Sequence, residues 1–295
     1  MNKLHTPLFL SMIVTFSFGT VYHATAQEAF VFPDTLKGYK LIWKGTLNGT
    51  QVSYNNWAKG GSNSISVTSG SILTLLYQKK RLHYGVRLDT RYGRARVNGN
   101  SNRKTDDRLS FRNRILYDIT NVDGMLRIYS DIHFLTQFAD GFEYAKNDTD
   151  PDVLISGWLS PAYLTESVGL MWQIKPKFSI ESGIGLKQTF VTDQALASRY
   201  GIPDGEQVRN EGGVTIGVSL EQEMMPNVTY TLGAETFSTF QGAFNETDVS
   251  ISNLIVGKIN SYLNMTFQFN LVYDRDFSTK LQTSQLLAAG LSVIL

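Results

Sequence analysis

The sequence predicts an all-β fold: a transmembrane, antiparallel, up-and-down β-barrel of about 12 strands, with short periplasmic turns and long extracellular loops. Three observations predict it. Apolar and polar side chains alternate along most segments from residue 43 onward. The connections between these segments alternate between long and short. Beyond the N-terminal region, no apolar run approaches the roughly 18 residues expected of a membrane-spanning helix.

The first 26 residues have the features of a secretory signal peptide. Lys3 supplies a basic start, residues 8–18 are apolar, and Ala24 and Ala26 form a small-x-small cleavage pattern. We therefore expect residues 1–26 to be removed, residues 27–41 to form a short periplasmic segment, and residues 42–295 to form the barrel. The sequence contains no cysteine, which excludes lipid attachment to cysteine, disulfides and cysteine metal sites.

The charge balance excludes one class of partner. The full sequence carries a formal charge of +1, and the loss of Lys3 with the signal peptide leaves a formally neutral chain. A neutral chain without a basic stripe gives no electrostatic reason to expect binding to nucleic acid.

The predicted strands run through the whole body of the chain. They cover residues 42–54, 63–78, 82–97, 107–120, 125–139, 158–174, 177–192, 211–224, 227–240, 248–258, 261–275 and 284–295. In the third strand, Leu82 and Val86 share one face, whereas Arg87 and Asp89 share the other. Because an Arg that faces lipid at mid-bilayer costs about 2–4 kcal/mol, the charged face is predicted to line the lumen.

Two of these strands depart from the pattern. In residues 158–174, Pro161 cannot donate a ladder hydrogen bond and Glu166 falls on the outer face. These features favour a bulge or a later start for that strand. Residues 248–258 show no clean alternation.

The connections carry the strongest signal for a membrane barrel. Long connections are predicted at residues 55–62, 98–106, 140–153, 193–210, 241–247 and 276–283, and short turns lie between them at residues 79–81, 121–124, 175–176, 225–226 and 259–260. This alternation is typical of barrels in a bacterial outer membrane and places both termini in the periplasm. The C-terminal Gly290, Val293 and Leu295 resemble the signal that the barrel assembly machinery recognises, although that signal usually ends in Phe.

Five blocks in order resemble the family catalogued as domain of unknown function 3078, from outer-membrane-type proteins of the Bacteroidetes group. They are NWAKGG at residues 56–61, KTDD at 104–107, TQFADG at 136–141, ISGWLSPAY at 155–163 and LVYD at 271–274. Gly157 and Trp158 are a departure, since a shorter apolar pair is expected there. The resemblance implies an outer-membrane barrel and brings no assigned activity, so it carries over no catalytic residue.

Few residues point to a reaction. His83 and His133 are predicted on lumen faces, and neither has the spacing of metal ligands or the neighbouring Ser of an outer-membrane phospholipase. Asp148, Asp150 and Asp152 could chelate calcium, but Pro151 restricts the backbone and no bidentate Glu follows, so solvated loop acids fit better. We therefore expect no enzymatic activity, no cofactor and no metal.

Two groups of residues are candidates for function. The first is a loop motif, in which paired glycines permit tight turns and the Trp either packs within its own loop, folds inward or contacts a partner; it comprises Asn56, Trp57, Gly60 and Gly61. The second is the charged lining of the lumen, comprising Arg87, Asp89, Arg91, Arg112, Arg114, Arg127, Asp131, Glu181, Lys187, Glu221, Glu223 and Glu235. Its arginines fall on the third to fifth strands and its glutamates on the seventh to ninth.

Two functions are consistent with this lining. The first is a porin-like channel or transporter in the outer membrane, in which a basic wall faces an acidic wall and small polar solutes pass between them. The second is a structural or envelope-assembly barrel, in which the same charges pair and close the lumen. A barrel of about 12 strands is intermediate in size between small filled barrels and wide porins, so the number of strands does not distinguish these two functions. The expected partners are outer-membrane lipids, the assembly machinery during biogenesis and small polar solutes.

Overall fold

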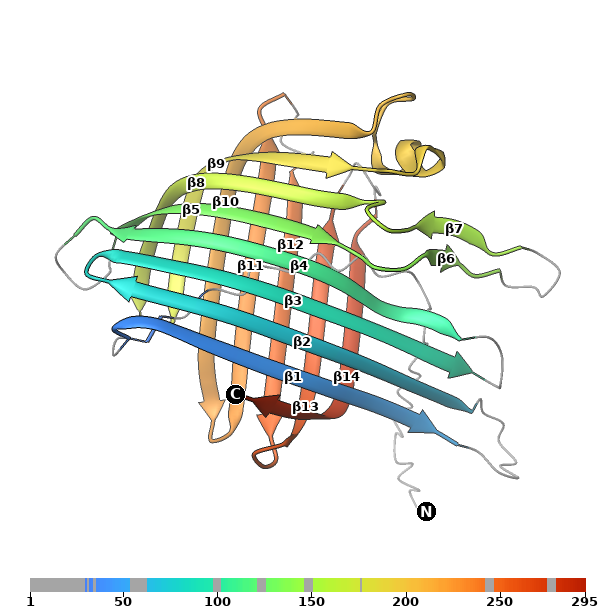
Figure 1. Cartoon of the computed structure of the whole chain (residues 1–295), viewed down its shortest axis with the longest axis horizontal. Coiled ribbons are helices and arrows are strands. Elements are labelled where there is room, and N and C mark those ends of the chain that lie inside the picture. The colour runs from blue at the N-terminus through green and yellow to red at the C-terminus, as the bar shows by residue number, and fades with distance from the viewer. Residues whose placement is uncertain are drawn as a thin grey trace, which may run out of the picture.

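Twelve strands form one closed antiparallel barrel in the computed structural model (Figure 1). The structure describes residues 30, 32–33, 36–53, 63–97, 102–120, 126–145, 151–175, 177–241, 247–274 and 280–295. The predicted signal peptide and the loop motif Asn56, Trp57, Gly60 and Gly61 lie outside the described residues. Each barrel strand pairs with its neighbours in the chain, and the last strand closes on the first. The predicted up-and-down barrel of 12 strands is confirmed.

The strands of the barrel follow the predicted order. They are β1 (Gly38–Val52), β2 (Ser64–Lys79), β3 (Leu82–Val97), β4 (Arg103–Asp118), β5 (Leu126–Thr136), β8 (Ala162–Lys175), β9 (Phe178–Phe190), β10 (Val208–Met225), β11 (Val228–Thr239), β12 (Asp248–Lys258), β13 (Leu263–Tyr273) and β14 (Gln282–Ile294). The third and tenth predicted strands have the observed bounds. The first begins at Gly38, earlier than expected.

The barrel has a short-turn end and a long-loop end. At the short-turn end only a few residues join β2 to β3, β8 to β9 and β10 to β11, and β1 begins and β14 ends there. The long-loop end carries a small hairpin of β6 (Gly141–Glu143) and β7 (Val153–Ser156), together with the 3-10 helix η1 (Gln194–Tyr200). The sequence pattern predicted only loops there. Among the described residues, no helix is long and apolar enough to cross a membrane.

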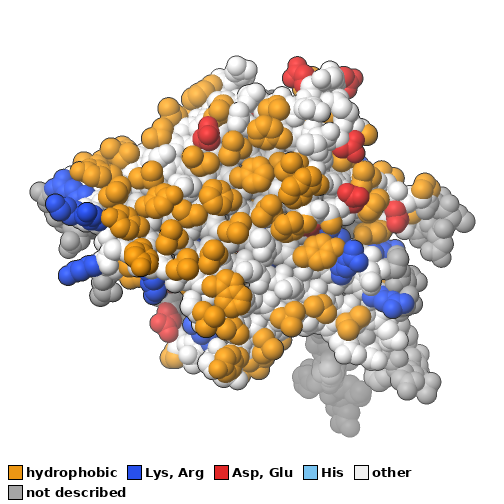
Figure 2. Space-filling view, viewed as in Figure 1, with side chains coloured by type: hydrophobic (Ala, Val, Ile, Leu, Met, Phe, Trp, Pro, Cys, Tyr) orange, Lys and Arg blue, Asp and Glu red, His pale blue; other side chains and the backbone are white. Residues whose placement is uncertain are grey.

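The two faces of the strands differ as the alternation predicts. The outward rows expose large apolar side chains such as Leu88, Phe111, Ile115 and Ile184. Figure 2 shows hydrophobic side chains spread over the middle of one outer face, whereas Lys and Arg gather nearer its ends. The inward rows bury charged side chains instead. The barrel therefore has an apolar outside and a polar inside, the reverse of a soluble protein.

The irregular sixth strand starts late, as Pro161 predicted. β8 begins at Ala162, directly after that proline, and its pairing with β9 shifts register between Gln173 and Lys175. Glu166 lies on the outer face of β8 and is exposed. A second irregularity lies in β4, which begins before the predicted residue 107 and shifts register opposite Gly93 and Arg94.

Three of the blocks that carry the family resemblance meet at the long-loop end. Lys104 Nζ contacts Asp107 Oδ2 at 3.0 Å and donates to the carbonyl of Ala139 at 2.7 Å. Asp107 also accepts from the backbone N–H groups of Phe138 and Ala139, both at 2.8 Å. Gln137 Nε2 donates to the carbonyls of residues 157 and 160. These blocks therefore hold the strand ends and loops of β4, β5 and β8 together.

The long connection between β9 and β10 has a hydrophobic core of its own. Asp193 caps the N-terminus of η1 by accepting from the N–H of Ala195, and Gly201 ends the helix in the left-handed region. Val191, Leu196, Ala197, Tyr200 and Ile202 form a buried cluster against which Leu154 of β7 packs. Tyr200 Oη donates to the carbonyl of Ile155 at 2.6 Å. The helix and the β6–β7 hairpin are thus one packed unit.

Candidate functional site in the barrel interior

The most buried charges form a cluster that crosses the interior. Arg112 and Arg114 of β4 both contact Asp131 of β5, with nitrogen–oxygen distances of 2.9 and 3.2 Å. Arg114 also pairs with Glu181 of β9. Because β5 and β8 separate β4 from β9 in the barrel, the Arg114–Glu181 pair bridges strands that are not neighbours and passes through the interior. We call Arg112, Arg114, Asp131 and Glu181 the charged layer.

A second ion pair crosses the interior on the other side. Lys187 Nζ of β9 lies 2.6 Å from Asp248 Oδ2 of β12 and 3.4 Å from Asp274 Oδ2, just after β13. The strands β10 and β11 separate β9 from β12, so this contact also bridges strands that are not neighbours. The Lys187 side chain is 12% exposed, and its nitrogen lies 6.0 Å from the Phe237 ring centre. Lys187 is therefore enclosed by groups from several strands.

An apolar cluster lies nearer the short-turn end. Leu116, Tyr129 and Met171 are buried together on inward positions of β4, β5 and β8, and Phe32 packs against them. Tyr129 connects them to the charged layer, because its ring lies 4.9 Å from the Arg114 guanidinium carbon. Its hydroxyl lies 3.3 Å from the hydroxyl oxygen of Thr215 on β10, across the lumen.

The segment before β1 enters the barrel. Phe30 is only 7% exposed and packs on Gly85, where an added Cβ would lie 2.6 Å from the ring. The Arg87 guanidinium lies 4.9 Å from the centre of the same ring. Phe32 meets the His83 ring edge-on at a centroid distance of 5.3 Å. Since all three partners lie on the inward row of β3, the segment fills part of the lumen. We call Phe30, Phe32, Leu116, Tyr129 and Met171 the aromatic layer.

Two of the three remaining predicted arginines, Arg91 and Arg127, lie close to acids, whereas Arg87 bonds to a threonine. Arg91 faces Asp106 at 3.8 Å, and Asp89 faces Arg108 at 3.2 Å. Arg87 donates to Thr74, and Arg127 donates to Asp118 at 2.6 Å. The basic wall is thus largely neutralised by acids on its own strands.

The predicted glutamates do not form one wall. Glu181 belongs to the charged layer, and Glu235 of β11 is close enough to Arg112 and Arg114 to interact with them electrostatically. Glu221 pairs instead with Lys177 at the short-turn end, and Glu223 is exposed there. The two walls therefore meet through ion pairs in the interior.

The two histidines lie on inward positions and have polar partners. His83 Nε2 is 2.9 Å from Asp118 Oδ2, and His133 Nε2 is 2.9 Å from the hydroxyl of Ser110. Of the three loop aspartates, Asp148 and Asp150 lie outside the described residues, and Asp152 accepts from the N–H of Ala145. Among the residues that the structure describes, no three His, Asp or Glu side chains are placed to hold a metal ion.

Sequence reasoning missed the aromatic layer and the partners of Lys187. One signal was available for the first: Phe30 and Phe32 stand two residues apart, directly before Pro33, in a segment with no predicted strand. Gly85, on an inward position of β3, adds to that signal because a residue without a side chain leaves room for a ring. No sequence spacing indicates that Asp248 and Asp274 approach Lys187, because the barrel's curvature brings them together.

The family model described as "Protein of unknown function (DUF3078)" matches residues 50–142. This stretch of the chain is a DUF3078 domain. The domain runs from the end of β1 into β6 and contains the first three of the five resembling blocks, together with both arginines of the charged layer. The blocks at 155–163 and 271–274 lie beyond it. No curated protein matches the chain.

Three solved structures are similar to the chain over most of its length. The translocator domain of the autotransporter NalP from Neisseria meningitidis is similar at 12% identity and a TM-score of 0.41, over 88% of this chain and 89% of that one. An outer-membrane channel from Pseudomonas putida F1 matches at 11% identity and a TM-score of 0.40, over 90% and 99%. The NanC porin matches at 7% identity and a TM-score of 0.35, over 85% and 97%.

Proposed function

We propose that the protein is an outer-membrane channel for small polar solutes that is closed in the form described here. The observation that carries this proposal is the placement of Phe30 and Phe32, which lie in the lumen and belong to no strand. Phe30 and Phe32 are held by ring packing and by the Arg87 guanidinium, so they can leave without breaking any ladder. Such a segment is suited to a gate.

The chemistry of the interior supports a path for solutes. Burying ion pairs gives little stability compared with apolar side chains of the same volume. An interior that served only as a core would gain nothing from Arg112, Arg114, Asp131 and Glu181, whereas a lumen that opens to water needs polar walls. The exposed apolar outer rows support residence in a membrane. The elaborated long-loop end is then extracellular, and both termini face the periplasm.

A structural barrel without conductance is the second candidate. The pairs Arg114–Glu181 and Lys187–Asp248 favour it, because they occupy the interior between strands that are not neighbours, independently of the N-terminal segment. For either candidate the partners are outer-membrane lipids and, during biogenesis, the assembly machinery. We propose no enzymatic activity, and hydrolysis of phospholipid by the purified protein would overturn that.

Conductance in a planar lipid bilayer tests the proposal. We expect little current from the unmodified protein and sustained openings from the Phe30→Ala/Phe32→Ala double variant, since both rings leave the lumen. Lys37→Ala is the matched control, because Lys37 belongs to the same segment but is exposed. It should behave as the unmodified protein does.

The second candidate gains if removing the rings produces no current. Adding Glu181→Gln to the double variant then removes one partner of a cross-lumen pair. If that triple variant folds into vesicles and still passes no current, the channel proposal is wrong and the structural barrel stands.

A further inference from the structure

The seam between β1 and β14 is much shorter than the other seams of the barrel. β1 pairs with β2 along its whole length, from Gly38 to Val52. It pairs with β14 only from Lys44 opposite Ile294 to Gly49 opposite Ala289, with one further pair of hydrogen bonds between Trp43 and Leu295. Towards the long-loop end the ladder stops, although both strands continue. β1 and β14 therefore part within the described residues.

The alternation of the antiparallel ladder shows which backbone groups face the gap. The bonds between Trp43 and Leu295 place odd-numbered residues of the two strands opposite each other, and the Ser292 N–H donates to Tyr262 on the β13 side. By the same alternation, Thr283, Gln285 and Leu287 of β14 direct their N–H and C=O groups towards β1. Among the described residues, none provides a backbone partner for these groups on that side.

This edge of β14, which has no backbone partner among the described residues, begins within the apolar band of the outer face. Leu287 is 64% exposed, pairs with Phe267 of β13 and lies on the same outward row as Leu291. Unpaired backbone groups are costly where lipid surrounds them, because lipid tails neither donate nor accept hydrogen bonds. The argument rests on the membrane setting proposed above, but not on whether the lumen conducts.

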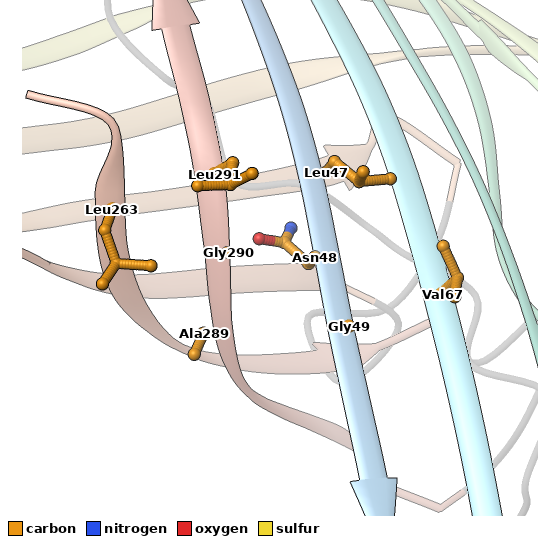
Figure 3. Close-up of a pocket in the computed structure, with 8 residues that line it drawn as sticks. All are labelled: Leu47, Asn48, Gly49, Val67, Leu263, Ala289, Gly290 and Leu291. Atoms are coloured by element: carbon orange, nitrogen blue, oxygen red, sulfur yellow. The ribbon is translucent and has the colours of Figure 1, made fainter.

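A groove lies over the last paired residues of the two strands, next to the point where the ladder stops (Figure 3). It has a volume of about 330 Å³, and its lining includes Leu47, Val67, Leu291 and the small residues Gly49 and Ala289. The Asn48 side chain points from β1 towards Gly290, whose position leaves no room for a Cβ. The groove is open to an apolar side chain that approaches along the edge of β14.

We propose that this edge of β14 binds an extended polypeptide segment of a partner protein as an added strand. Such a strand supplies partners for the N–H and C=O groups of Thr283, Gln285 and Leu287, which a lipid chain cannot do. Alternate side chains of a strand point to the same face, so one bulky apolar residue of the segment fills the groove beside Ala289. Backbone bonds provide the affinity, and the groove selects the side chain.

Amide hydrogen exchange in lipid nanodiscs tests the proposal. In the free protein, the amides of Thr283, Gln285 and Leu287 should exchange about tenfold faster than those of Ala289 and Leu291, which the β1 ladder protects. A short synthetic peptide in which Val and Leu alternate with Thr should slow the three amides by about tenfold. The same peptide with alternate backbone nitrogens methylated keeps its side chains but loses its donors, and should not protect them.

Two disulfide staples provide a matched pair of variants, because the chain has no cysteine of its own. Thr50→Cys/Ala288→Cys joins the next non-hydrogen-bonded pair of the register and closes the gap. Thr46→Cys/Ser292→Cys joins a pair inside the existing ladder and leaves the gap open. The Thr46–Ser292 pair suits a disulfide as it stands, since such partners lie about 4.5 Å apart between Cα atoms, and the Thr50–Ala288 pair reaches this spacing when the gap closes. The first staple should abolish protection by the peptide until it is reduced, and the second should not.

Several outcomes overturn the proposal. Slow exchange of the three amides without peptide means that the edge is already covered. Protection that rises with protein concentration assigns the edge to a second copy of the chain, and equal protection by the methylated peptide shows adhesion to the groove only. If the Thr50→Cys/Ala288→Cys variant does not fold, the comparison of the unmethylated and methylated peptides still tests the proposal. If the variants without the rings pass no current in the bilayer, the channel proposal is wrong, but the exchange results still test the binding edge.

Discussion

The charged layer and the aromatic layer fill the same lumen with opposite chemistry. In the charged layer, every group belongs to a barrel strand, and the pairs tie β4 to β5 and to β9. In the aromatic layer, two of the five side chains come from the segment before β1 and touch the wall only through ring contacts. The difference teaches that ion pairs join the strands of the barrel wall from within, whereas part of the filling comes from residues outside the sheet.

Breaking the charged layer should have the largest effect. Arg114→Met leaves the Glu181 carboxylate buried without its partner, which costs about 3–5 kcal/mol of folding free energy. Denaturant titration of the protein in lipid vesicles measures this loss. Arg114→Met combined with Glu181→Leu is the matched variant and should lose far less folding free energy. Both charges of the pair are removed, and Asp131 still pairs with Arg112. Equal losses in the single and double variants would show that the pair does not couple the strands.

Displacing the aromatic layer should have a smaller effect on stability and a clear effect on accessibility. Gly85→Leu places a side chain where the Phe30 ring lies and should cost about 1–3 kcal/mol while expelling the N-terminal segment. Faster tryptic cleavage after Lys37 in the folded protein measures the expulsion. Gly257→Leu is the control, since nothing lies within 4 Å of a Cβ built there. Unchanged cleavage in Gly85→Leu would mean that Phe30 does not occupy that position.

The two layers also differ in how far the sequence predicts them. The charged layer follows from strand alternation, because Arg112 and Arg114 share the face opposite Phe111 and Ile115 and an Arg cannot face lipid cheaply. The pairing of Arg114 with Glu181 does not follow, since two strands separate β4 from β9 and only the closed barrel brings them together. Strand periodicity predicts nothing about Phe30 and Phe32, because they lie in no strand.

The loops repeat this lesson at the long-loop end. Their positions follow from the alternation of long and short connections, but η1 and the β6–β7 hairpin do not, because each is too short to show a period of its own. They form through contact with each other, as the bond from Tyr200 to the carbonyl of Ile155 shows. The blocks around Lys104 and Gln137 are recognisable in the sequence, whereas their meeting depends on the register of β4 and β5.

Trimming the second ring should test whether the aromatic layer stabilises the barrel or only fills it. Phe32→Ala removes a partly buried ring from Leu116, Tyr129 and Met171 and should cost about 1.5 kcal/mol. Denaturant titration in vesicles measures the loss. Phe240→Ala, at a ring that is 65% exposed, should change stability by less than about 0.5 kcal/mol. If Phe32→Ala loses as much folding free energy as Arg114→Met, the two layers do not differ in how much they stabilise the barrel.

The smallest effect should come from an ion pair outside both layers. Lys177 and Glu221 meet at the short-turn end with side chains 49% and 32% exposed, whereas Arg114 in the charged layer is 2% exposed. Water screens the rim pair, so Lys177→Gln should cost no more than about 1 kcal/mol, and less at high salt. The loss at Arg114 should be nearly independent of salt, because the low-dielectric interior screens it little. The stability losses of both variants in vesicles should therefore be measured at several salt concentrations. A loss that depends on salt indicates a solvent-exposed ion pair, and a loss that does not indicates a buried one. Equal salt dependence in the two variants would show that Arg114 is exposed to water.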